Sequence, residues 1–313
     1  MADISAPNHA YKLSTTMPKI IIIGECNLEV TFPADSSDSW PLLMTGRPGG
    51  CLLNAAAMLG RKGMQVSFVA DAARDSLGDL LVRYLDSCNV DTHCIDRYSD
   101  GGVTSSDFIF PATDTIITNR HFPVGENFNC TWPRIDHDDL VVFGGFFALD
   151  DRSRPQVMEM VSYAAERKAT VIYVPGFVPS LVPRITRVMP AILENLELAD
   201  IVYADTADLR TIWNETSPDE CYRRNINFYC RTLLCADTPS KAVTLHYPGG
   251  KVSADITATC RHGSLRAAAG LAALIGFIAG RNITREHIDL GLTCQQSDEM
   301  ISIVARSISD SED

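Results

Sequence analysis

The sequence predicts an α/β protein: a doubly wound, mostly parallel sheet with a small β-sheet lid. Short apolar runs alternate with helical segments along the 313 residues, which is the βαβ rhythm of such sheets. Most of the runs are apolar throughout, as expected for strands that are buried on both faces. Residues 103–122 instead alternate β-branched and aromatic side chains without a helical period. Together with residues 28–34, this stretch predicts the lid.

Each expected element follows from its local pattern. The expected strands of the main sheet are residues 19–24, 66–70, 140–144, 170–174, 200–204 and 242–246. The expected helices are residues 52–61, 77–89, 155–167, 188–196 and 219–234. One domain is predicted over residues 17–306, with flexible tails at 1–16 and 307–313.

Composition and charge argue against several kinds of partner. The formal charge of −12, from 27 Lys and Arg against 39 Asp and Glu, disfavours general binding to nucleic acid or anionic membranes. The apolar run at 20–23 is too short for a signal peptide or a membrane span. Ten cysteines, irregularly spaced and without a Cys-x-x-Cys pair, do not make a zinc or disulfide framework. A reducing cytoplasm fits these features best.

A first candidate site lies near the N-terminus. Asn27 and Glu29 follow the first strand, and Gly49, Gly50 and Asn54 lead into the next helix. Amide and carboxylate groups pair with adjacent hydroxyls, while glycines let backbone N–H groups approach a ligand. These residues predict a polyol pocket. The alternative is a plain glycine turn with Asn54 as an ordinary early-helix residue.

A second candidate site lies where a turn opens the Ala-rich run that ends at residue 280. The turn reads Arg261, His262, Gly263 and Ser264. The first N–H groups of a helix have no internal partner, so such a turn is suited to bind an anion such as phosphate. Loops of this kind are normally rich in glycine, but here most of the glycines are replaced.

Several motifs together resemble the ribokinase-like, or PfkB, family of carbohydrate kinases. The family's Gly-x-x-Asn-x-Asp is present with Asn27 kept and Glu29 in place of Asp. Its Gly-Gly-x-x-x-Asn-x-Ala is complete from Gly49 to Ala56, and its Gly-x-Asp-x-x-Gly follows with Ala73 in place of the first glycine. The resemblance covers nearly all of residues 18–305. It implies a sugar or nucleoside ligand in the polyol pocket, ATP and Mg²⁺ as cofactors if the protein is active, and a homodimer through the lid.

Two motifs of the second half depart from the family pattern. The family's Asn-x-x-Glu, which helps organise magnesium, is replaced by Asp205 and Asp208. Both can still serve a cation that prefers carboxylate oxygens, or they can form an N-cap and an acidic first turn of a helix. The nucleotide-side Thr-x-Gly turn is matched to Thr244 and His246. There His246 either crowds the nucleotide or faces solvent.

The resemblance also implies that two glycines belong to the nucleotide-binding site. Gly249 follows the Thr-x-Gly match and leaves that turn pliable, and Gly263 belongs to the turn that binds the transferring phosphate.

The largest departure concerns the catalytic motif, where the resemblance sets Ser264 at the position of the general base. The family's Gly-Ala-Gly-Asp becomes Arg261, His262, Gly263 and Ser264. A serine does not act as a base at neutral pH without an activating partner. His262 can substitute as base or stay exposed, and Arg261 can clamp a phosphate or block its site. The structural alternative is a helix N-cap at Ser264 with Arg261 in solvent.

We therefore expect a divergent carbohydrate-kinase homologue that binds a sugar- or nucleoside-like ligand with weak or no phosphotransfer. The alternative is an active ATP-dependent sugar or nucleoside kinase, in which His262 or an acid from elsewhere in the chain replaces the missing base.

Overall fold

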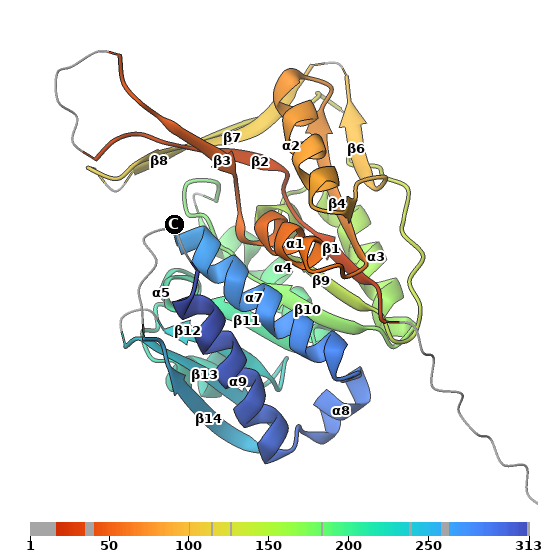
Figure 1. Ribbon diagram of the computed structural model, residues 1–313, viewed down its shortest axis with the longest axis vertical. Coiled ribbons are helices and arrows are strands. Elements are labelled where there is room, and N and C mark those ends of the chain that lie inside the picture. Colours follow the sequence, from red (N-terminus) through yellow and green to blue (C-terminus); the bar gives the residue numbers. More distant parts are fainter. Residues whose placement is uncertain are drawn as a thin grey trace, which may run out of the picture.

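A large, mostly parallel sheet dominates the computed structural model (Figure 1). The structure describes residues 17–34, 41–99, 101–113, 115–125, 127–182, 184–237, 240–257 and 263–311. The order of its strands is β14 (Gly250–Asp255), β13 (Ala242–Tyr247), β12 (Leu233–Asp237), β11 (Ile201–Asp205), β10 (Thr170–Val174), β9 (Leu140–Gly144), β1 (Ile20–Ile23), β4 (Val66–Ala73) and β5 (Val90–Asp91), with β6 (Ile95–Tyr98) also paired to β4. The pairs from β5 to β12 are parallel, whereas β13 and β14 are antiparallel. The predicted α/β fold is confirmed.

Helices cover both faces of the sheet, and each face has its own apolar core. The core of one face contains residues of α1 (Cys51–Arg61), α2 (Ser76–Ser87), α7 (Gly263–Gly280), α8 (Arg285–Leu290) and α9 (Cys294–Ser309). The core of the other face contains residues of η1 (Phe146–Ala148), α3 (Arg154–Glu166), α4 (Ile185–Leu198), α5 (Thr206–Trp213), α6 (Pro218–Cys221) and η2 (Tyr222–Ile226). Strand β1 explains why both faces must be covered. Ile20 and Ile22 point into the first core and Ile21 and Ile23 into the second, because side chains alternate along a strand.

A separate four-stranded sheet forms the lid, as predicted, and extends away from the main sheet (Figure 1). Its order is β3 (Thr45–Pro48), β2 (Asn27–Thr31), β7 (Val103–Phe110) and β8 (Thr115–His121). Strands β2 and β7 are parallel, and the two outer pairs are antiparallel. Strand β3 was not among the expected elements.

Two sequence predictions are corrected by the fold. The helix expected at 219–234 is only the short α6 and η2, after which the chain enters strand β12. The apolar residues Leu233 and Leu234 suit a helix or a buried strand equally by pattern, and the sheet recruits them because both of its faces are covered. At the C-terminus, α9 continues to Ser309, so part of the expected tail is helical and Ile308 is buried.

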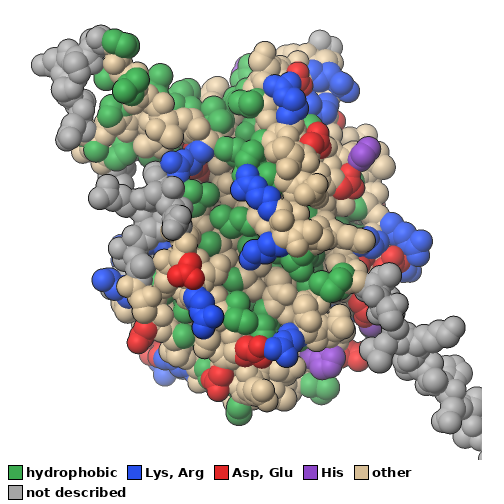
Figure 2. Space-filling view, viewed as in Figure 1, with side chains coloured by type: hydrophobic (Ala, Val, Ile, Leu, Met, Phe, Trp, Pro, Cys, Tyr) green, Lys and Arg blue, Asp and Glu red, His purple; other side chains and the backbone are tan. Residues whose placement is uncertain are grey.

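The surface over α7 and α9 carries Lys and Arg side chains interspersed with Asp and Glu (Figure 2). Within the described residues, no helix is long and apolar enough to cross a membrane.

Candidate functional site

A cavity of about 390 Å³ lies where the lid meets the carboxyl ends of the parallel strands. Three helices begin at its wall: α1 with Gly50 and Cys51, α5 with Asp205, and α7 with Ser264. Lid residues on β7 and β8 form the opposite side. Helix N-termini favour negative charge and present unpaired N–H groups, so this cavity is suited to a ligand with an anionic part.

Glu29 and Ser264 are brought together in this cavity from positions 235 residues apart. The Ser264 hydroxyl donates to Oε2 of Glu29 at 3.1 Å. The other carboxylate oxygen, Oε1, accepts the Gly50 N–H at 2.9 Å. Glu29 therefore bridges the N-termini of α1 and α7.

Asn27 lies beside them at the start of β2 and lines the cavity. Its Nδ2 donates to Asp107 of β7 at 2.6 Å. Its Oδ1 is buried and has no hydrogen-bond partner among the described residues. A buried acceptor without a partner is costly in a protein, so a ligand O–H or N–H donor fits this position.

Gly49 is required by close packing under the cavity. A Cβ atom at this position would come within 2.9 Å of both amide atoms of Asn27 and of Cγ of Glu29. Gly50 has a φ of +80°, a conformation that favours glycine. Of the glycine pair predicted to form the pocket, Gly49 allows the side chains of Asn27 and Glu29 to pack against the backbone of the loop, and Gly50 allows the loop to turn.

Asn54 has a different place from the one expected. It is buried in α1, and its Nδ2 donates to the carbonyls of Pro48 at 3.0 Å and Gly50 at 2.8 Å. It is not among the cavity-lining residues. Asn54 thus holds the glycine loop, residues 48–50, in place through these two hydrogen bonds from α1.

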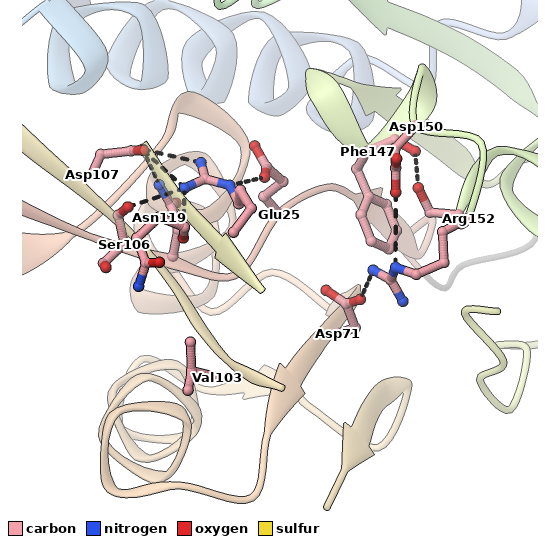
Figure 3. Close-up of polar contacts among 12 residues, drawn as sticks. Glu25, Asp71, Val103, Ser106, Asp107, Asn119, Phe147, Asp150 and Arg152 are labelled. Atoms are coloured by element: carbon pink, nitrogen blue, oxygen red, sulfur yellow. Dashed lines mark hydrogen bonds and ion pairs between the residues drawn. The ribbon is translucent and has the colours of Figure 1, made fainter. Parts of the chain in front are cut away.

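A largely buried ion-pair network, which we call the lid clamp, joins Glu25, Asp107 and Arg120 (Figure 3). Arg120 of β8 donates from Nε to Glu25 at 2.8 Å and from Nη1 to Asp107 at 2.8 Å. Burial raises the pKa of Glu25, and the Arg120 charge opposes that shift. Sequence reasoning missed Arg120 because no motif contains it and its partners are distant in the chain.

Asp205 and Asp208 both line the cavity and also cap α5. Asp205 accepts the Asp208 N–H at 2.8 Å, and Asp208 accepts the N–H groups of Phe177 at 2.8 Å and of Asp205 at 3.3 Å. Burial and the neighbouring Asp205 carboxylate raise the pKa of Asp208 to about 7. The described residues contain no cluster of three or more His, Cys, Asp or Glu side chains able to hold a metal.

The expected nucleotide residues Thr244, His246 and Gly249 do not line the cavity. Strand β13 is antiparallel to β12, so it runs away from the edge where the parallel strands end. The carboxyl end of β12 reaches the cavity instead, through Ala236.

His246 is held elsewhere. It is buried, stacks on Tyr222 with ring centroids 4.6 Å apart, and its Nε2 lies 2.8 Å from Asp219. Burial lowers its pKa, and the Asp219 carboxylate opposes this. Its burial excludes the exposed position considered from the sequence, and the crowding of a nucleotide stays a prediction.

The turn that opens α7 is described only in part. Gly263 begins α7 and Ser264 follows it into the cavity wall. The roles expected for Arg261 and His262 concern residues outside the described part of the chain.

The fold and the site define an α/β protein with a lid sheet over a cavity at the carboxyl ends of its parallel strands, the place where open α/β sheets commonly bind their ligands. The model of the pfkB family of carbohydrate kinases matches residues 17–226. The chain belongs to this family.

Solved structures with the same fold have distant sequences. Aminoimidazole riboside kinase from Salmonella enterica, in complex with aminoimidazole riboside and an ATP analogue, has 13% identity and a TM-score of 0.76, with 94% of each chain covered. Fructokinase from Xylella fastidiosa with bound ATP has 17% identity and a TM-score of 0.73, covering 94% of this chain and 93% of that one. Fructokinase from Vibrio cholerae O395 with fructose, ADP and calcium has 12% identity and a TM-score of 0.74, covering 94% and 91%. A search of the curated proteins finds no match.

Proposed function

We propose that this protein binds a sugar or nucleoside in the cavity and is a poor phosphotransferase. The observation that carries the proposal is the contact between Ser264 and Glu29. The motif resemblance sets Ser264 at the position of the family's general base, and its hydroxyl donates a hydrogen bond to a carboxylate. A serine hydroxyl is itself too weak a base to remove a proton from a substrate hydroxyl.

The ligand side of the cavity supports binding of a polyol. Asn27 offers an acceptor that has no partner among the described residues, and Glu29 offers a carboxylate; both are suited to ligand hydroxyls. The cavity volume of about 390 Å³ lies within the usual range for small-molecule sites. The structural relatives carry aminoimidazole riboside or fructose, which are ligands of this size and chemistry.

The phosphate side supports nucleotide binding with a modified magnesium site. Asp205 and Asp208 supply carboxylate oxygens, the ligands that Mg²⁺ prefers, and water would complete the coordination. Bound Mg²⁺ would neutralise phosphate charge. Both Asp208 oxygens already accept backbone N–H groups, so we expect Asp205 to make the closer contact with the ion.

A well-placed general base contributes about 10² to 10⁴ to a rate, so loss of the acid from the position of Ser264 should forfeit part of that factor. Positioning and charge neutralisation still contribute to phosphoryl transfer. We therefore expect slow but measurable transfer rather than none.

Calorimetric titration tests the proposal without assuming the acceptor. ATP and ADP are titrated with and without Mg²⁺, followed by D-fructose, D-ribose and adenosine. We expect at least one of the three to bind, and nucleotide to bind more tightly with Mg²⁺. Product formation is then followed by mass spectrometry. The absence of any binding by the sugars and the nucleoside, or transfer at rates typical of kinases (1–100 s⁻¹), would contradict the proposal.

A further inference from the structure

The two departures from the family pattern in the cavity are complementary. At the start of α7, the Asp of the family motif is replaced by Ser264, which has no carboxylate. On β2, the Asp of the family motif is replaced by Glu29, whose side chain is one methylene longer. One extra methylene moves a carboxylate by about 1.5 Å. In the structure this longer side chain brings Oε2 to 3.1 Å from the Ser264 hydroxyl.

We infer that Glu29 is the proton acceptor for the phosphotransfer this protein retains. The Glu29 carboxylate lies within hydrogen-bond distance of Ser264, the residue that the motif resemblance sets at the position of the family's base. This inference rests on the proposed function, because it requires an acceptor hydroxyl and a nucleoside triphosphate in the cavity.

The geometry favours this role for Glu29 over the other acids of the cavity. Glu25 and Asp107 are held by the Arg120 guanidinium. Asp208 accepts two backbone N–H groups, and Asp205 caps α5. Glu29 differs because one of its hydrogen bonds is to a side-chain hydroxyl, which a ligand hydroxyl can replace without unsatisfying the backbone.

The chemical step balances with this residue. The acceptor O–H bond breaks and its proton moves to Oε2 of Glu29, while the acceptor oxygen forms a bond to the γ-phosphorus of the nucleoside triphosphate. The bond from that phosphorus to the β–γ bridging oxygen breaks, and the nucleoside diphosphate leaves with the electron pair. Glu29 then releases the proton to solvent. Ser264 orients the carboxylate and is a positioning residue.

The test compares single-turnover rates with ATP, Mg²⁺ and whichever of D-fructose, D-ribose or adenosine binds. Glu29→Gln keeps the size of the side chain and an acceptor for the Gly50 N–H. We expect it to lower the rate at least 100-fold and to change the ligand Kd by less than 10-fold.

Two further variants separate position from charge. Glu29→Asp keeps the charge but retracts it from Ser264, so we expect at least a 10-fold loss. The double variant Glu29→Asp/Ser264→Asp restores both acids of the family pattern, and we expect it to exceed the wild-type rate at least 10-fold. Glu286→Gln, at an exposed carboxylate of α8, is the matched control and should equal the wild type.

The outcomes distinguish the two proposals. A wild-type protein that binds ligand but forms no product, or a Glu29→Gln variant that keeps the wild-type rate, overturns the role of Glu29 and leaves the binding function intact. A wild-type protein that binds none of the three probes removes the proposed function itself.

Discussion

Replacing Arg120 by methionine tests whether the lid clamp stabilises the fold. The change removes the guanidinium but keeps most of the apolar stem. The side chain of Arg120 is 8% exposed, and the side chains of Glu25 and Asp107 are 17% and 15% exposed. Removing one partner of a buried ion pair costs about 3–5 kcal/mol. Because the cavity admits water next to these carboxylates, we expect about 3 kcal/mol at pH 8.

The pH dependence of this loss gives a second check. Burial holds the pKa of Glu25 above its usual value, and removal of Arg120 takes away a charge that lowers it. An acid whose pKa is higher in the folded state binds more protons there, so its contribution to stability falls as the pH rises. The Arg120→Met variant should therefore lose less stability at pH 5.5 than at pH 8.

Urea unfolding at the two pH values measures both effects. Arg187→Met is the control, since it breaks an exposed ion pair of 3.0 Å with Asp151 and should change stability by less than about 1 kcal/mol. A loss below about 1 kcal/mol for Arg120→Met at pH 8, or a larger loss at pH 5.5 than at pH 8, would refute this reasoning.

Three other variants test the remaining site and core contacts. Asn54→Ala removes two hydrogen bonds to the loop of Pro48 and Gly50. It should lower the free energy of unfolding in urea by about 1–3 kcal/mol and weaken ligand binding in calorimetry. Unchanged affinity would mean that the loop needs no support. Asp208→Asn removes the charge repulsion from Asp205 and keeps one side-chain oxygen as a hydrogen-bond acceptor. The free energy of unfolding at pH 8 should therefore change by less than about 2 kcal/mol. Mg²⁺-dependent nucleotide binding should weaken at least 10-fold. Burial raises the pKa of Asp200 to about 6 despite its ion pair with Arg285. The contribution of Asp200 to stability therefore declines from pH 4 to pH 7. Asp200→Asn should flatten the dependence of the unfolding free energy on pH over that range, and an unaltered pH profile would contradict the raised pKa of Asp200.

The parallel core is predictable from sequence because its strands are buried on both faces and read as continuous apolar runs. Residues 20–23 and 140–144 are examples, and the structure places them side by side in register. Strand direction is not encoded in such local patterns. The run at 242–246 is a strand as predicted, but its antiparallel pairing carries Thr244 and His246 away from the cavity.

The candidate site is predictable only where a single segment carries it. Asn27 and Glu29 are recognisable because they follow one strand at fixed spacing. The contacts that give them their roles join distant segments: 95 residues separate Glu25 from Arg120, and 235 separate Glu29 from Ser264. Such pairs depend on how lid and helices pack, which periodicity does not report.

The lid clamp also bears on how quickly a ligand can enter or leave. Arg120 belongs to the lid strand β8, whereas Glu25 follows strand β1 of the main sheet. Any opening of the lid on this side must separate that buried pair, and water must then solvate both charges. We therefore expect the clamp to slow ligand exchange more than it changes equilibrium affinity, so that dissociation half-lives report on Arg120 even where titrations do not.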